Sequence, residues 1–142
     1  MLALMRTNIA LNDLSSKARA LVYDWGTPVP EACRGTFARG TRTMEMEALR
    51  KRGGYHYPDV VLAADCVYFE PAFPLLLGSL GDLLGDRTVC WFCFKRRRKA
   101  DARFVKELKK KFDTEAVEYE GVEGDRREGI TLLKVVTKGS TA

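Results

Sequence analysis

The sequence predicts an α/β fold, with a mostly parallel sheet joined through helices and an antiparallel hairpin near the C-terminus. Two apolar runs, at residues 59–64 and 88–94, have the length and composition of buried strands. Each is followed by a segment with the apolar spacing of a helix. Strands that alternate with helices form parallel pairs with right-handed crossovers, which defines the fold class.

The composition is that of one ordinary domain. The chain has 142 residues, of which 46% are hydrophobic and 30% are charged. These values exclude a disordered tail, a collagen-like repeat and a disulfide-dense miniprotein. No apolar run approaches the length of a membrane-spanning helix, and Arg6 and Asn8 fall where a secretory signal would be apolar. We therefore expect a single-domain, soluble protein of the cytoplasm or nucleus, without membrane contact.

The elements follow in order from local patterns. Residues 2–12 show helical spacing. Residues 17–26 are β-prone and end in a glycine before a Thr-Pro turn signal, which predicts a strand with Trp25 at its C-terminal end. Residues 30–57 show only a weak pattern, with one short helical segment, and are expected to form a long loop or insertion.

The second half of the chain predicts two helix-linked strands and a hairpin. Residues 59–64 are apolar enough for a strand buried on both faces. Residues 72–84 form a helix, and the strand 88–94 is followed by a helix with an apolar stripe beneath a basic face. Residues 114–138 are expected to form a strand, a polar turn and a second strand.

The cysteine pair Cys90 and Cys93 has a spacing found in zinc sites and redox dithiols. It lies inside an unbroken apolar run, and the single histidine, His56, lies in another segment without a second close cysteine pair. We therefore favour a buried strand with reduced thiols, and expect no metal site.

Polar and aromatic residues gather where the predicted strands end. Trp25, the stretch 65–70 and the stretch 95–98 all follow strands, and ligands of parallel sheets bind at that edge. Asp65 has the alternative role of a helix cap, although several residues separate it from the next helix. Tyr68 would present an aromatic face suited to a cation or a flat ring, whereas Trp25 is by default a core or rim residue.

Positive charge is concentrated in one segment. The net charge is +5, yet residues 95–111 alone carry 10 Lys and Arg against 2 acids. Such a stripe can bind nucleic acid, an acidic protein or a membrane surface, but most often it is a solvated helix face.

Three blocks of the sequence resemble those of a known enzyme family. They are LMRTNIALN, LVYDWG and VVLAADCVYFEPAFPLLLGSL, and they include an Asp-x-x-Tyr motif at Asp65 to Tyr68 and a Trp-Gly pair at Trp25 and Gly26. The chain is similar to the seven-β-strand protein-lysine methyltransferases related to the valosin-containing-protein lysine methyltransferase and the fungal elongation-factor lysine methyltransferases. The resemblance covers most of the chain, apart from residues 30–57 and the basic run.

The resemblance implies methyl transfer from S-adenosylmethionine to a lysine of a protein substrate, such as an elongation factor or a chaperone-like ATPase; nucleic acid is not expected. Trp25 and Ala64 would line the adenosyl pocket, and Asp65 and Tyr68 would lie near the substrate lysine. The fold would be a partial Rossmann-like sheet. In the family order 3-2-1-4-5-7-6 the first two strands would be missing, so that the chain forms the C-terminal part and is inactive alone. The alternatives are a noncatalytic basic module that binds acidic protein or RNA, and a degenerate partner of a full-length homologue.

Overall fold

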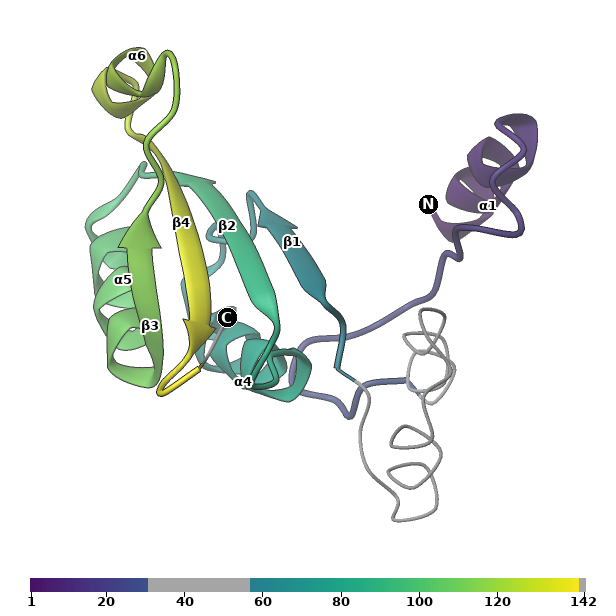
Figure 1. Ribbon diagram of the computed structural model, residues 1–142, viewed down its shortest axis with the longest axis horizontal. Helices are drawn as coiled ribbons and strands as arrows, with labels where there is room; N and C mark the ends of the chain where they lie inside the picture. The colour runs from purple at the N-terminus through teal and green to yellow at the C-terminus, as the bar shows by residue number, and fades with distance from the viewer. Residues whose placement is uncertain (31–56, 141–142) are drawn as a thin grey trace.

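The computed structural model describes residues 1–30 and 57–140 and contains a four-stranded mixed sheet with helices packed against it (Figure 1). The first segment holds α1 (Leu2–Leu11). The second runs in the order β1 (Val60–Ala64), η1 (Glu70–Ala72), α4 (Phe73–Leu83), β2 (Val89–Lys95), α5 (Lys99–Lys111), β3 (Phe112–Ala116), α6 (Val122–Arg127) and β4 (Ile130–Thr137).

The strand order is β1-β2-β4-β3. Strands β1 and β2 are parallel and are joined through α4, whereas β4 is antiparallel to both β2 and β3. The α/β class and the C-terminal antiparallel hairpin are therefore confirmed. The order also matches the 4-5-7-6 part of the sheet that the resemblance implies. The polar turn of the hairpin contains the short helix α6.

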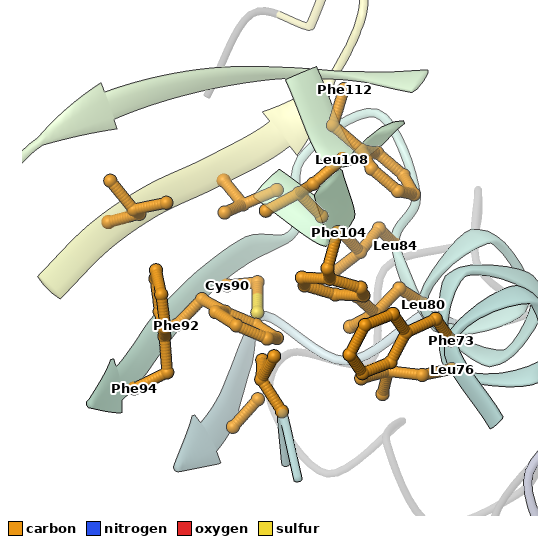
Figure 2. Close-up of a cluster of buried hydrophobic side chains, with 14 of the residues drawn as sticks. Phe73, Leu76, Leu80, Leu84, Cys90, Phe92, Phe94, Phe104, Leu108 and Phe112 are labelled. Atoms are coloured by element: carbon orange, nitrogen blue, oxygen red, sulfur yellow. The ribbon is translucent and has the colours of Figure 1, made fainter. Parts of the chain in front are cut away.

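The core lies between the sheet and helices α4 and α5 (Figure 2). Alternate residues of β2 are buried, because successive side chains of a strand point to opposite faces. The Phe104 ring of α5 stacks on Phe92 of β2, with 5.7 Å between ring centroids, and contacts Phe73 of α4 at 5.0 Å. The side chains that fill this layer are Phe73, Leu76 and Leu80 from α4, Cys90, Phe92 and Phe94 from β2, and Phe104 and Leu108 from α5.

Strand β1 departs from its expected burial. Val60 is 53% exposed and Leu62 is 79% exposed, although Ala63 on the other face belongs to the core. Within the described residues, β1 pairs only with β2, so one edge is open and the face that carries Leu62 is uncovered. The expectation of a strand buried on both faces is therefore wrong for the described part of the chain.

The N-terminal segment also differs from expectation. Helix α1 forms as predicted, but it buries no residue and stands apart from the sheet (Figure 1). The predicted strand at residues 17–26 is wrong, because this stretch is irregular and ends in a turn. A strand needs a hydrogen-bonded neighbour, and no strand of the described residues pairs with it.

The remaining expectations for the first half concern a long loop or insertion at residues 30–57. Of this range, residues 31–56 lie outside the described part of the chain. Among the residues that are described, no helix combines the length and the apolar character needed to cross a membrane.

Candidate functional site

The first component of the site is the turn that follows β1. The backbone N–H of Asp65 donates to the Cys93 carbonyl at 3.0 Å, which extends the parallel pairing by one residue. Asp65 then adopts φ 51°, in the left-handed region. Aspartate tolerates this conformation better than most residues, and such strained positions cluster at binding sites. The turn leaves the Asp65 side chain 71% exposed at the carboxyl end of β1.

A second turn holds Trp25 against the same region. The Thr27 N–H donates to the Asp24 carbonyl at 3.1 Å, with Gly26 at φ 82° in the position that requires a left-handed residue. The Gly26 N–H donates to the hydroxyl oxygen of Ser79, a buried residue of α4, at 2.9 Å. A Cβ at position 26 would lie 2.7 Å from the Leu75 side chain, so the backbone approaches α4 closely.

These two turns bring Trp25 and Tyr68 together. Their ring centroids are 6.1 Å apart and the ring planes are tilted by 51°. Trp25 is half-buried against the core cluster, whereas Tyr68 is 61% exposed and remains accessible to a ligand. The two rings form an aromatic corner in the segment that follows β1, with Tyr68 three residues along the chain from Asp65.

Ala64 occupies a different face. It is the last residue of β1, and the alternation of the strand places it with Leu62 on the uncovered face, whereas Ala63 points into the core. The structure thus places Ala64 next to Asp65 in the chain, but its side chain does not share the core-facing side with Trp25. Its expected role beside Trp25 stays a prediction.

Basic residues from the loop after β2 complete the edge. One guanidinium nitrogen of Arg97 lies 3.6 Å from Asp65 Oδ1, and both side chains are more than half exposed. The loop is held by Asp101, a fully buried carboxylate of α5 that accepts from the backbone N–H groups of Arg97 at 2.8 Å and Arg98 at 2.9 Å. The N–H of Arg96 donates to the Gly129 carbonyl at 2.8 Å, which ties the loop to the start of β4.

A second acid–base pair lies alongside. Arg103 in α5 forms an ion pair with Glu70 in η1, and Arg97 in the preceding loop pairs with Asp65, so these two ion pairs flank the segment that carries Tyr68. The sequence did not predict the specific contacts of Arg97, Arg103 and Asp101, although it indicated the charged segment in which they lie. An acid at the third position of a helix is a capping signal that could have indicated Asp101, but no local pattern indicates the other two, whose partners are more than thirty residues away.

The cysteines near this edge, Cys66, Cys90 and Cys93, are free thiols with raised pKa values. Burial raises the pKa of Cys90 to about 12, with a further contribution from Cys66. Burial and the negative charge of Asp65 raise the pKa of Cys66. Burial and the negative charges of Asp65 and Asp125 raise the pKa of Cys93. Cys90 and Cys93 point to opposite faces of β2, as an odd spacing in a strand requires. The predicted strand is confirmed, and within the described residues no three potential ligands form a metal-binding group.

Comparison with known proteins adds an independent observation. A family model described as lysine methyltransferase matches residues 45–111, which include Ala64, Asp65 and Tyr68 but not Trp25. The protein-lysine N-methyltransferase EFM6 of Saccharomyces cerevisiae is 31% identical over 141 residues, 97% of this chain and 52% of the yeast protein. Over most of its length this chain is similar to lysine methyltransferases. The resemblance seen in the three sequence blocks is thereby confirmed.

Two further relatives agree with this assignment. The protein N-lysine methyltransferase METTL21A of Danio rerio is 30% identical over 119 residues, 83% of this chain and 53% of that protein. The EEF1A lysine methyltransferase 3 of Mus musculus is 51% identical over 39 residues, 28% of this chain and 17% of that protein. The chain spans about half the length of the first two curated relatives it matches.

Proposed function

We propose that this chain provides the lysine-binding side of a protein-lysine methyltransferase that uses S-adenosylmethionine. The observation that carries the proposal is the convergence of Asp65, Tyr68 and Trp25 at the carboxyl end of β1, from turns that lie far apart in the sequence. Two of the three residues lie in the stretch that matches the lysine methyltransferase family. The proposed substrate is a protein, and the name of the mouse relative suggests a translation elongation factor.

The geometry suits capture of a lysine side chain. The ion pair between Asp65 and Arg97 is long and exposed, and such pairs contribute little to stability. A substrate ammonium can therefore replace the guanidinium beside Asp65 at small cost. The exposed ring of Tyr68 offers a face to the aliphatic stem and the charged head of the lysine.

Methyl transfer requires the amine rather than the ammonium. With a reference pKa near 10.4, only about one lysine in a few thousand is neutral at pH 7. An ionised Asp65 favours the ammonium, so its role is to capture and orient the side chain, not to act as a base. Exclusion of water from the lysine head by the bound substrate and donor would favour the neutral amine.

The aromatic corner fits part of the methyl donor. The half-buried indole of Trp25 and the Tyr68 ring beside it suit a flat base or a cationic sulfonium. S-adenosylmethionine supplies, when bound, a methyl group on a cationic sulfur that an amine nitrogen can attack. Trp25 would stack on the donor, while Asp65 and Tyr68 orient the lysine.

The test uses a chimera in which this chain replaces the segment of yeast EFM6 that it matches. Asp65→Asn should lower methyl transfer to elongation factor EEF1A by about a hundredfold while donor affinity, measured by calorimetry, changes by less than about twofold. Trp25→Ala should instead weaken donor binding by about tenfold through lost stacking.

Tyr68→Ala has a matched control in Tyr119→Ala, because Tyr119 is also exposed but its hydroxyl donates to Asp125 in α6. We expect only the first substitution to impair transfer. Full transfer by the Asp65→Asn chimera would remove Asp65 from the site and overturn the proposal.

A further inference from the structure

The solvent side of α5 carries an unusual density of positive charge. Its buried side is formed by Ala100, Asp101, Phe104 and Leu108. Of these, Phe104 and Leu108 pack into the hydrophobic core (Figure 2). The opposite side presents exposed basic residues at helical spacing, so that they lie on one face. We call this the basic face of α5, and it consists of Lys99, Arg103, Lys106, Lys109 and Lys110.

Most of this charge is not neutralised within the described residues. Arg103 pairs with Glu70, and Lys110 pairs with Glu107. Lys99, Lys106 and Lys109 form no ion pair with any described residue. Like charges at neighbouring helical positions repel one another. These three lysines therefore do not stabilise the fold through ion pairs, and their charge is available to a partner.

The basic face is continuous with the candidate site. At its N-terminal end, Arg103 contacts Glu70, and the preceding loop places Arg97 beside Asp65. Helix α5 begins at Lys99, directly after this loop, and its 13 residues span about 20 Å. An extended peptide covers that length with about six residues. A polypeptide whose lysine lies at Asp65 and Tyr68 can thus lay its next residues along this face.

We propose that the basic face of α5 binds an acidic segment of the protein substrate, located within about six residues of the target lysine. This inference rests on the proposed function and specifies its substrate class. Charge complementarity favours a segment with several carboxylates, because Lys99, Lys106 and Lys109 form no ion pair with any described residue. The face lacks the exposed aromatic rings on which single-stranded nucleic acid stacks, since Phe104 of α5 is buried.

The test measures peptide binding by fluorescence anisotropy with the full 142-residue chain and no methyl donor. The probe is a peptide of about twelve residues with one lysine followed by glutamates, and its control has glutamines in place of the glutamates. The triple variant Lys99→Gln, Lys106→Gln, Lys109→Gln should weaken binding of the acidic peptide about tenfold. The glutamine peptide should bind weakly to both proteins.

A matched variant controls for net charge. Arg87→Gln, Arg127→Gln, Lys138→Gln removes the same number of exposed charges elsewhere and should change the affinity less than about twofold. Raising the salt concentration from about 50 mM to about 500 mM should abolish the difference in affinity for the acidic peptide between the two triple variants. Equal losses in the two triple variants would overturn the proposal, since binding would then reflect net charge alone.

Two further outcomes separate this inference from others. An oligouridine that binds more tightly than the acidic peptide, and loses binding in the same triple variant, would overturn it in favour of nucleic acid. In the chimera, the α5 variant should raise KM for the protein substrate without changing kcat. Failure of methyl transfer with peptide binding intact would refute the proposed function while leaving the acidic-peptide surface in place.

Discussion

A buried carboxylate, Asp101, fixes the loop that brings Arg97 to the candidate site, and its removal has a calculable effect. The side chain is fully buried, and it accepts hydrogen bonds from the backbone N–H groups of Arg97 and Arg98 and from the Arg98 guanidinium at 3.1 Å. We expect Asp101→Ala to release the start of α5 and the loop together.

The expected loss follows from these contacts. Hydrogen bonds to a charged group contribute about 1.5–3 kcal/mol each, but Arg97 and Arg98 are exposed and water can replace part of each bond. Loss of a helix-capping interaction typically costs about 1 kcal/mol. Asp101→Ala should therefore lower the free energy of unfolding by about 2–4 kcal/mol. Glu107→Ala is the control, because Glu107 forms only a surface pair with Lys110 and should cost less than about 1 kcal/mol.

The pH dependence of this loss provides the decisive readout. Burial alone would raise the pKa of Asp101, but the backbone N–H groups and the charge of Arg98 outweigh burial and lower it. The folded-state pKa therefore lies below the unfolded value of about 3.9, and the stabilisation is present above that value and lost as the pH falls through the folded-state pKa. In urea unfolding, the difference in free energy of unfolding between wild type and Asp101→Ala should become smaller as the pH falls into the acid range. A difference that keeps its full size in strong acid would refute this explanation.

Three further predictions concern the strained turn, the Trp25 turn and the open edge. Asp65→Gly should relieve the strain of the left-handed backbone, so that the free energy of unfolding stays unchanged or rises by up to about 1 kcal/mol. The same substitution should abolish lysine methylation by the chimera. A lower free energy of unfolding in urea would contradict this explanation. Ser79→Ala should leave the Gly26 N–H without its hydrogen-bond acceptor. We expect faster hydrogen exchange at Gly26 and a red shift of Trp25 fluorescence emission. An unchanged exchange rate would show that this hydrogen bond does not hold the turn. Leu62→Lys should reduce any self-association seen by light scattering without changing the urea midpoint, because the side chain is 79% exposed on a strand whose outer edge no described residue pairs with. Undiminished scattering would exclude this edge as the contact.

Local sequence patterns were sufficient for the elements that bury an apolar face. Helix α4, strand β2 and the β3–β4 hairpin were predicted within a few residues of their bounds, and α5 follows β2 as its apolar period predicted. The segment at residues 17–26 has β-prone composition as well, but composition cannot supply the neighbouring strand that a strand requires. The same holds for β1, whose apolar side chains indicate burial while the described residues cover only one of its faces.

The assignment of the site residues stays a prediction, although the structure bears on their arrangement. The end-of-strand rule placed Asp65 and Tyr68 after β1, whereas the strand expected to end at Trp25 is absent from the described residues; the Trp25 ring nevertheless lies 6.1 Å from the Tyr68 ring. The left-handed backbone of Asp65 depends on how β1 leaves the sheet and has no signature in the residue itself. The pairing of Arg97 with Asp65 depends on the register between β1 and β2, which is a tertiary property.

The most direct test of the account is methyl transfer to purified elongation factor EEF1A, followed by mass spectrometry of the intact protein. Three samples are compared: the EFM6 chimera with this chain, the same chimera with Asp65→Asn, and the 142-residue chain alone. We expect full methylation with the first sample, about a hundredfold less with the Asp65→Asn chimera and none with the chain alone, because we propose that the Asp65 edge captures the lysine and that the yeast segment supplies the rest of the donor site. Undiminished methylation by the Asp65→Asn chimera would contradict the assignment of the site, and methylation by the chain alone would contradict the expectation that residues 1–142 are inactive by themselves.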